Sequence, residues 1–204
     1  MSRRAATCLL AAALLAGCGG SSSGGGASGG GGAPDAAADT GGAAGSSARS
    51  VPPCPELPRV APREDGLPPL RLDCLGEGPA VRLSDLRGTP TVLNVWAAWC
   101  TNCDREMPLF AQVQERAGDR LRFLGVHYKA PRGYALRSEV DFGVPFPSVH
   151  DEDGDRVVRA LDAYAPPQTL FVTAEGRVAG RKVGEISSTD ELSGLVEKYL
   201  RVTL

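Results

Sequence analysis

The sequence lacks an apolar run long enough to cross a bilayer as a helix, and it lacks a basic stripe. Its N-terminal apolar stretch, residues 5–16, has about a dozen residues, whereas a spanning helix needs about 20. The 22 Lys and Arg residues are scattered without interleaved aromatic side chains, and the formal net charge is −2. We therefore expect no nucleic-acid partner, because such a protein needs clustered positive charge to follow the phosphates.

The N-terminal residues have the pattern of an export signal. Arg3 and Arg4 form a positive region before the apolar stretch, which ends in Leu14-Leu15-Ala16-Gly17-Cys18. This ending resembles a bacterial lipobox, in which cleavage before Cys18 leaves a lipidated N-terminal cysteine. We predict a lipoprotein signal peptide over residues 1–17 and an extracytoplasmic protein anchored to the bacterial cell membrane. An ordinary secretory signal with an accidental cysteine is the alternative.

Apart from Pro34, residues 19–50 lack any aliphatic or aromatic side chain larger than Ala, and they consist almost entirely of Gly, Ala and Ser. Such a segment cannot offset the entropy that it would lose on ordering. We predict a lipid-anchored flexible linker over residues 18–50, with an r.m.s. span of roughly 30 Å, and a Pro-rich lead-in over residues 51–69. One folded domain is predicted over residues 70–204, and we expect it to be a monomer.

The pattern of the folded part alternates strands and helices. Short alternating segments at residues 70–72 and 81–83 predict a hairpin, and the dense apolar run at 91–97 predicts a buried central strand. A helix ending at Gly118 is predicted to follow it. Further helices are predicted at 133–141, at 156–164 and from 188 onward, and further strands at 121–128, 146–150, 169–173 and 177–183. This order predicts an α/β fold with a mixed sheet and helices on both faces.

Cysteine carries the chemical signal of this sequence. Of the six cysteines, Cys8 and Cys18 belong to the predicted signal, which leaves four. In Trp99-Cys100-Thr101-Asn102-Cys103, two cysteines follow a predicted buried strand and open a helix. The helix dipole favours the thiolate of Cys100, and Cys103 can resolve a mixed disulfide by attacking Cys100. The pattern therefore predicts a redox-active CxxC pair.

Two other uses of the CxxC pair are less consistent with the sequence. A zinc site needs a second close cysteine pair or suitably spaced histidines, and neither is present. A purely structural disulfide does not fit the strand–CxxC–helix context. For Cys54 and Cys74 we predict a structural disulfide that closes a loop of about 20 residues, with a second redox pair as the alternative. His127 and His150 are interpreted as ordinary strand-end residues, and no metal or dissociable cofactor is expected.

Several short motifs occur in an order typical of one known family. They are Leu83-Ser84-Asp85-Leu86-Arg87-Gly88, Leu93-Asn94-Val95-Trp96-Ala97, the WCTNC motif, Glu106-Met107-Pro108, the turn at residues 151–154 and Pro167-Gln168-Thr169-Leu170-Phe171-Val172. Together they resemble the TlpA/ResA/DsbE group of bacterial extracytoplasmic thioredoxin-like oxidoreductases over residues 70–204. The resemblance implies a thioredoxin fold, with an N-terminal β-hairpin and an insertion between the central strand–helix units.

The resemblance also implies roles for residues outside the CxxC pair. Pro167 falls where this fold has a cis-proline opposite the two cysteines, and Trp99, Pro166 and Pro167 are the expected substrate-binding residues. Pro166 departs from the family pattern, because its nitrogen cannot donate a hydrogen bond to a docked substrate. A rigid turn before a strand is the alternative interpretation of Pro166-Pro167.

Glu106 lies three residues after Cys103 and therefore on the same helix face. The family carries an acidic residue at this position, which takes part in proton transfer at the active-site thiols. The alternative is an acidic residue that merely complements the helix dipole. Asn94 stands where cytoplasmic thioredoxins have a buried Asp, so Glu106 is expected to take over that role.

We thus expect a thiol–disulfide oxidoreductase that acts on exported proteins through WCTNC. A reductase is the first hypothesis, and its electrons would come from a membrane thiol transporter; one role of the family is the reduction of apocytochrome c before haem attachment. The alternatives are a disulfide-forming oxidase or isomerase reoxidised by a membrane partner, a non-enzymatic tethered docking or chaperone module, and a thiol peroxidase. The expected partners are protein dithiols and disulfides.

Overall fold

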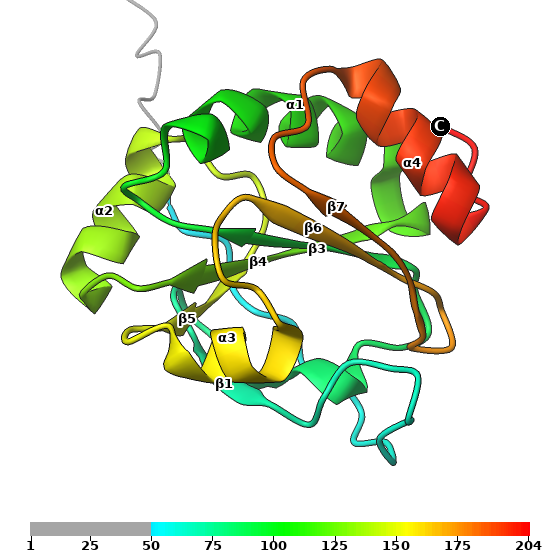
Figure 1. Cartoon of the computed structure of the whole chain (residues 1–204), viewed down its shortest axis with the longest axis horizontal. Helices are drawn as coiled ribbons and strands as arrows, with labels where there is room; N and C mark the ends of the chain where they lie inside the picture. The colour runs from blue at the N-terminus through cyan, green and yellow to red at the C-terminus, as the bar shows by residue number, and fades with distance from the viewer. Residues whose placement is uncertain (1–49) are drawn as a thin grey trace, which may run out of the picture. The chain divides into compact units, whose positions relative to one another are not determined.

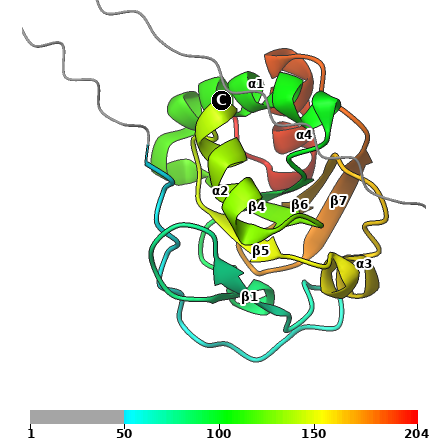
Figure 2. The ribbon, with the colours of Figure 1, turned by 90° about the vertical axis from the view of Figure 1, so that its left-hand side faces the viewer.

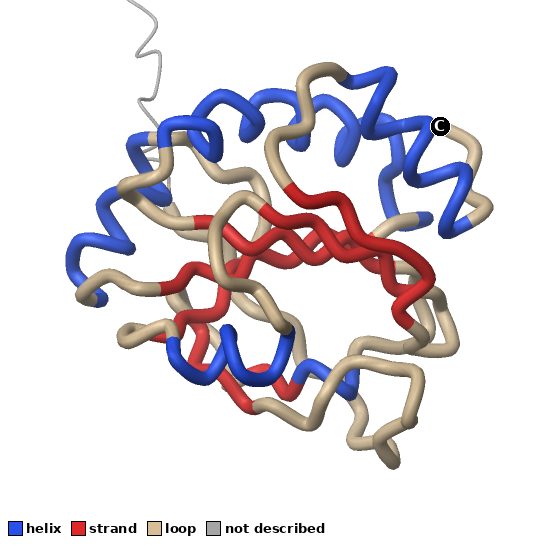
Figure 3. Tube along the Cα trace, viewed as in Figure 1, coloured by secondary structure: helices blue, strands red, loops and turns tan. Residues whose placement is uncertain are grey.

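The computed structural model describes residues 50–204, which form a seven-stranded sheet with helices on both faces (Figure 1). The strands are β1 Arg71–Cys74, β2 Val81–Arg82, β3 Thr91–Trp96, β4 Arg122–Tyr128, β5 Ser148–Asp151, β6 Gln168–Val172 and β7 Val178–Val183. The helices are α1 Thr101–Ala117, α2 Arg132–Asp141, α3 Asp155–Leu161 and α4 Thr189–Leu200, with short 3₁₀ turns at Leu83–Asp85 and Gly118–Arg120. The expected alternation of strands and helices is confirmed (Figure 3).

The predicted signal peptide, the lipidation residue Cys18 and nearly all of the predicted linker lie outside the described residues. They stay predictions. Within residues 50–204, no helix combines the length and the apolar character that crossing a membrane requires.

The sheet is mixed, and β3 lies near its centre. The strand order is β2-β1-β5-β4-β3-β6-β7, with β3 parallel to β4 and antiparallel to β6. Every residue of β3 is buried, as expected of a strand covered on both faces. The strand therefore delivers the chain that follows it, the WCTNC segment, to one end of a rigid sheet.

The two faces of the sheet are covered by different helices. Helices α1 and α4 pack side by side on one face, and α3 lies on the other (Figures 1 and 2). Under α1, Phe110 contacts Phe123 of β4 and Phe146, with ring centroids 6.1 and 6.0 Å apart. This aromatic cluster fixes α1, and with it the segment that carries both cysteines, against the sheet.

Helix α1 has its buried residues at helical spacing and a defined start and end. Cys100 is the N-cap, and its sulfur accepts a hydrogen bond from the Cys103 backbone N–H. Gly118 ends the helix with a φ of 53°, a conformation that favours glycine. The buried side chains are Cys103, Glu106, Met107, Phe110, Val113 and Ala117. Glu106 is thus the only carboxylate on the buried stripe of α1.

The N-terminal hairpin is confirmed, and it is also part of the main sheet. Strand β1 pairs antiparallel with β2 and, on its other side, antiparallel with β5. The Pro-rich lead-in is fastened to this edge: Arg82 donates to the Val60 carbonyl at 2.8 Å, and Leu67 is buried. The lead-in therefore packs as part of the described unit, although it forms no strand.

The predicted insertion consists of α2 and β5, which lie between β4 and α3. Two predicted boundaries near it differ from the structure. The strand expected at 146–150 begins at Ser148, because Pro147 has no N–H to donate to a ladder. The helix expected at 156–164 ends at Leu161, since Asp162 turns into the left-handed region with a φ of 54°.

Candidate active site

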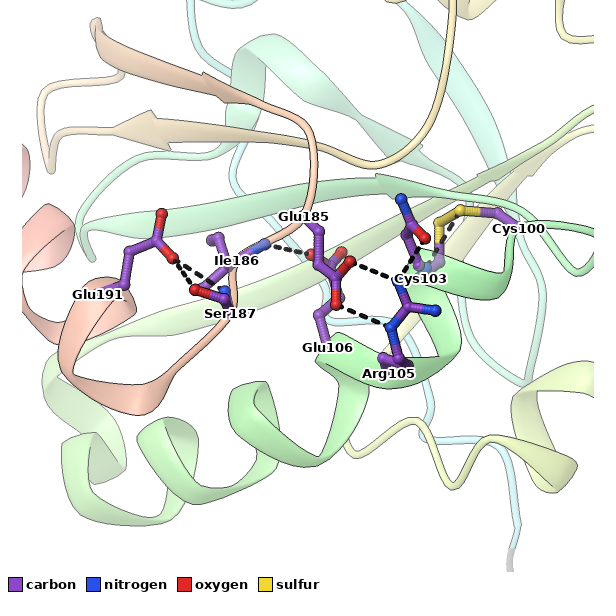
Figure 4. A network of polar contacts seen from close by, with 9 residues as sticks. Cys100, Cys103, Arg105, Glu106, Glu185, Ile186, Ser187 and Glu191 are labelled. Carbon is purple, nitrogen blue, oxygen red and sulfur yellow. Dashed lines mark hydrogen bonds and ion pairs between the residues drawn. A yellow bond between two sulfur atoms is a disulfide. The ribbon is translucent and has the colours of Figure 1, made fainter.

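The two cysteines of WCTNC form a disulfide at the N-terminus of α1. Their Cα atoms are 5.3 Å apart, and the Cys103 N–H lies 3.2 Å from the Cys100 sulfur (Figure 4). Cys100 keeps 7% of its surface exposed, whereas Cys103 is fully buried. The first sulfur is therefore the one that a partner can reach, and the second can act only on Cys100.

The position of Cys100 favours its thiolate once the disulfide is reduced. The sulfur caps a helix of 17 residues, whose unpaired backbone N–H groups and dipole stabilise negative charge. The N–H of Cys103 already points at this sulfur in the oxidised state. A thiolate leaving group or nucleophile at Cys100 is thus stabilised without any rearrangement.

A buried histidine holds the turn that leads from β3 to Cys100. His127 of β4 accepts a hydrogen bond at its Nε2 from the Ala98 N–H, at 3.2 Å. Burial, and to a lesser degree His150, lowers the pKa of His127 to about 3, so the ring is neutral. Because Nε2 accepts, the ring proton sits on Nδ1. His127 is therefore a positioning residue that sequence analysis missed, although its place on a buried strand beside WCTNC was a usable signal.

Glu106 is fully buried beside the disulfide and makes two specific contacts. One carboxylate oxygen accepts from the Asn94 side-chain amide at 2.8 Å, and the other accepts from the Ile186 N–H at 3.1 Å. Burial raises the pKa of Glu106 from 4.5 to about 7, against the lowering by both hydrogen bonds. Nearby Glu185 and Glu191 raise it further. Such a carboxyl can both bind and release a proton near neutral pH.

The Pro166–Pro167 peptide is cis and lies at the same end of the sheet as the cysteines. Residue Gln168, which follows it, pairs with Val95 near the end of β3. Because β3 and β6 are antiparallel, the start of β6 and the end of β3 meet there. The Gly184 N–H donates to the Pro167 carbonyl at 3.0 Å, which fixes the cis segment to the end of β7.

Two exposed aromatic side chains frame this end of the sheet. Trp99 is 52% exposed, and its indole N–H donates to the Lys129 carbonyl at 3.0 Å. Tyr164, which precedes the cis peptide by two residues, is 72% exposed. Tyr128 links the two, because its ring lies 6.2 Å from that of Trp99 and its hydroxyl donates to the Tyr164 carbonyl. These side chains form an apolar rim that could contact a docked protein segment.

The second disulfide, Cys54–Cys74, lies elsewhere in the fold. It joins the lead-in to the end of β1, with Cα atoms 5.8 Å apart, and both cysteines are buried. Strands β5 and β4 separate β1 from β3, which corresponds to about 14 Å at the usual strand spacing. The structure therefore does not bring the two cysteine pairs together.

A second buried carboxyl, Glu139 of α2, was not singled out by the sequence. Burial raises its pKa to about 8. Among the described residues, neither of its oxygens has a partner in hydrogen-bonding geometry. Within residues 50–204, no group of three or more His, Cys, Asp or Glu side chains could hold a metal ion.

Comparison with known proteins places this site in a family. Residues 65–181 match the AhpC/TSA family. The chain belongs to the AhpC/TSA family. Its relatives include thiol:disulfide interchange protein DsbE of Vibrio cholerae, 33% identical over 139 residues that cover 66% of this chain and 73% of the relative. DsbE of Pseudomonas fluorescens biotype C is 33% identical over 57% of this chain and 64% of its own length.

Solved structures related to DsbF and DsbE agree with the sequence relatives. The structure of MTB dsbF, in mixed oxidized and reduced forms, has a TM-score of 0.57 and 27% identity, and covers 65% of this chain and 98% of that chain. A secreted Mycobacterium tuberculosis disulfide oxidoreductase homologous to E. coli DsbE has a TM-score of 0.55 and 26% identity, and covers 64% of this chain and 96% of that chain. The thioredoxin fold and the resemblance to DsbE are thus confirmed, and the chain is a thiol–disulfide oxidoreductase.

Proposed function

We propose that this AhpC/TSA-family protein reduces disulfides of exported proteins outside the cytoplasm, with Cys100 as the attacking residue and Cys103 as the resolving residue. The observation that carries the proposal is the unequal exposure of the two cysteines at the start of α1, next to a buried carboxyl. An attacking thiolate must be accessible, and a resolving thiol must be close and protected from competing partners. Cys100 meets the first requirement because it is partly exposed, and Cys103 meets the second because it is fully buried next to Cys100.

The proposed reaction transfers two electrons to the substrate. The Cys100 thiolate attacks one sulfur of a substrate disulfide, which forms a mixed disulfide and releases the other substrate sulfur as a thiolate. Cys103 then loses its proton and attacks the Cys100 sulfur, so the second substrate sulfur leaves. The substrate ends as a dithiol, and the protein ends with the Cys100–Cys103 disulfide described above. A reduced thiol partner must restore the dithiol before the next cycle.

Glu106 is the proposed acceptor of the Cys103 proton. Its pKa of about 7 lies below the ordinary cysteine value of about 8.5, so the carboxylate is present at neutral pH and can take the proton. The hydrogen bonds from Asn94 and Ile186 favour the ionised form, against the larger effect of burial. The acid that results can then protonate the departing substrate thiolate, which balances the proton in the cycle.

Trp99, Pro166 and Pro167 are the proposed substrate-docking residues. Pro166 has no N–H, so main-chain pairing with a docked segment would use carbonyl oxygens of this strand end alone. The exposed faces of Trp99 and Tyr164 offer apolar contact in place of the missing donor. We propose that the substrate cysteine lies in a segment with apolar neighbours.

The remaining parts of the proposal concern location and partners. A lipid on Cys18 and the flexible linker of residues 18–50 would hold the domain at the membrane, within reach of a membrane thiol donor. The likeness to DsbE and the family role in cytochrome c maturation support apocytochrome c as a substrate. For Cys54–Cys74 we propose a structural role, because the bond ties the lead-in to β1.

The direct test is trapping of the mixed disulfide. With an exported protein carrying one disulfide as substrate, the Cys103→Ser variant should accumulate a covalent complex that dithiothreitol releases, and the Cys100→Ser variant should not. A Cys54→Ser/Cys74→Ser variant is the matched control and should turn over without accumulating a complex. A complex formed by Cys100→Ser but not by Cys103→Ser would reverse the assigned roles and contradict the proposal.

A further inference from the structure

The segment between β7 and α4, residues 184–188, lies against Glu106 (Figure 4). Its central residue, Ile186, is fully buried and donates its backbone N–H to a Glu106 oxygen at 3.1 Å. The two residues are 80 positions apart in the sequence. The protection of this carboxyl from water therefore depends on where the 184–188 segment is held.

An ion pair fastens the segment to α1 on one side of Ile186. The Arg105 guanidinium donates to both oxygens of Glu185, at 3.0 and 2.7 Å (Figure 4). It also donates to the Asn102 side chain at 2.6 Å. Arg105 is the neighbour of Glu106 in α1, and Glu185 is the neighbour of Ile186 in the segment. A bidentate Arg–carboxylate contact has a fixed geometry, so it restrains the backbone that follows it.

A second set of contacts fastens the segment on the other side. Both the N–H and the hydroxyl of Ser187 donate to one oxygen of Glu191, each at 2.9 Å. Lys182 of β7 donates to the other oxygen at 2.6 Å and, as the largest cause, lowers the pKa of Glu191 to about 2. Ile186 thus lies between two anchored neighbours. Of the two anchors, only the Arg105–Glu185 pair reaches the helix that carries the cysteines.

We propose that Arg105 and Glu185 are a positioning pair, which keeps the 184–188 segment closed over Glu106 so that Ile186 stays bonded to the carboxylate and water stays away from it. The inference rests on the proposed function, in which Glu106 accepts the proton of Cys103. If the pair is broken, the segment opens and Glu106 becomes hydrated. Opening the segment has two opposite effects on the pKa of Glu106, because hydration lowers it and loss of the Ile186 hydrogen bond raises it. Burial is the larger of the two causes, so the net effect is a lower pKa and a weaker base.

The alternative is an influence of charge without positioning, and the two accounts predict opposite shifts of the Glu106 pKa when Arg105 is lost. The groups around Glu106 are its neighbours Cys103 and Arg105 in α1, Asn94 of β3, Glu185 of the segment, Glu191 of α4 and, bonded to Glu191, Lys182 of β7. By charge alone, loss of Arg105 would raise the pKa of Glu106 and loss of Glu185 would lower it. Under the positioning proposal both losses open the segment, so both lower the pKa.

The test uses the oxidised protein, with Arg105→Met and Glu185→Gln as single variants and Arg105→Glu/Glu185→Arg as the exchanged pair. Arg159→Met and Asp155→Asn are matched controls, because they make the same charge changes in an exposed ion pair of α3. Two quantities are measured by NMR: the titration of the Glu106 side-chain carboxyl and the hydrogen-exchange rate of the Ile186 N–H. Neither readout requires a substrate or turnover.

Both single variants should lower the pKa of Glu106 by about one unit and speed exchange at Ile186 by about tenfold or more. The exchanged pair should restore most of the original Glu106 pKa and Ile186 exchange rate. Arg105→Lys keeps the charge but not the bidentate contact, so both of its values should lie between those of the unmodified protein and Arg105→Met. The controls should change neither quantity.

Opposite pKa shifts in the two single variants, or unchanged exchange at Ile186, would overturn the proposal. Failure of the proposed function is a separate outcome. It would appear as a Glu106→Gln variant whose thiol–disulfide exchange rate equals that of the unmodified protein, at any hydrogen-exchange rate of the Ile186 N–H.

Discussion

The two disulfides of this protein have similar Cα–Cα distances, 5.8 and 5.3 Å, but different surroundings. Cys100–Cys103 joins residues three apart within the first turn of α1, whereas Cys54–Cys74 joins residues 20 apart in two separate segments. Opening the first bond should leave the helix and the sheet intact, because both cysteines lie at one end of the same helix, and it frees a sulfur at a helix N-terminus. Opening the second would free the lead-in from β1. The surroundings of a disulfide, more than the bond itself, therefore decide whether it serves chemistry or the fold.

The same lesson applies to the two buried glutamates. Glu106 has two hydrogen-bond donors and lies on the buried stripe of α1 with Cys103. Glu139 has no partner in hydrogen-bonding geometry among the described residues and lies on α2, over Ser148. Burial raises both pKa values. Only Glu106 combines a raised pKa with a position next to the thiols, so Glu139 is a natural control for it.

The largest expected effect separates the two disulfides by activity. Replacing Cys100 with Ala should lower the rate of substrate disulfide reduction by at least about 10³-fold, because within residues 50–204 no other accessible thiol lies at this site. The Cys54→Ala/Cys74→Ala variant should keep its rate within about twofold. Reduction of a model protein disulfide, followed with each variant, measures both. Equal losses in the two variants would show that Cys54–Cys74 belongs to the redox reaction.

The same pair of variants should separate the disulfides by stability. Removing Cys54–Cys74 should lower the free energy of unfolding by roughly 3 kcal/mol, as expected for a closed loop of this length. The Cys100–Cys103 bond closes a much shorter loop, so its removal should lower the free energy of unfolding clearly less. Denaturant unfolding under non-reducing conditions measures both values. A larger loss for Cys100→Ala/Cys103→Ala would contradict the assignment.

The pH dependence of stability should reveal the raised pKa of Glu106. Because its folded-state pKa of about 7 exceeds its ordinary value of 4.5, its contribution to stability is complete below pH 4.5 and is lost as the pH rises through 7. The shift corresponds to about 3 kcal/mol at most. The free energy of unfolding of Glu106→Gln, minus that of the unmodified protein, should therefore be more positive at pH 8 than at pH 4.5. A difference that does not change between these pH values would mean that the carboxyl titrates normally.

The smallest expected effect compares the two glutamates in catalysis. Glu106→Gln should slow resolution of the mixed disulfide by about 10²-fold at pH 7, the lower end of the range for a proton-transfer group. The loss of rate should become smaller as the pH approaches the pKa of the free Cys103 thiol, because the thiol then ionises without a base. Glu139→Gln should leave the rate unchanged, although it also removes a buried carboxyl. Single-turnover kinetics across pH 6 to 9 give both results, and equal effects of the two changes would remove Glu106 from the mechanism.

The sequence predicted the parts of the fold that depend on local pattern. The alternating and apolar runs predicted the order of strands and helices, and WCTNC at the start of a helix predicted where the cysteines lie. The ends of elements were less predictable. Pro147 delayed β5, and Asp162 stopped α3 in a left-handed turn, because single residues decide such boundaries.

What the sequence could not predict are contacts between distant segments. The pairing of β1 with β5 joins a strand that ends at Cys74 to one that begins at Ser148, with about half of the described chain between them. The bond between Ile186 and Glu106 spans 80 residues and uses a backbone N–H, which has no signature in the sequence. The same holds for the bond from Ala98 to His127. Roles that rest on side-chain type were thus open to prediction, and the groups that hold those side chains in place were not.

The reduction potential of the Cys100–Cys103 pair tests the central claim most directly. It can be measured by equilibration with glutathione buffers, with Cys54 and Cys74 left intact. The proposed reductase should have a value near or below roughly −250 mV, close to that of thioredoxin. A value above about −180 mV, towards that of DsbA, would contradict it and assign the protein to disulfide formation instead.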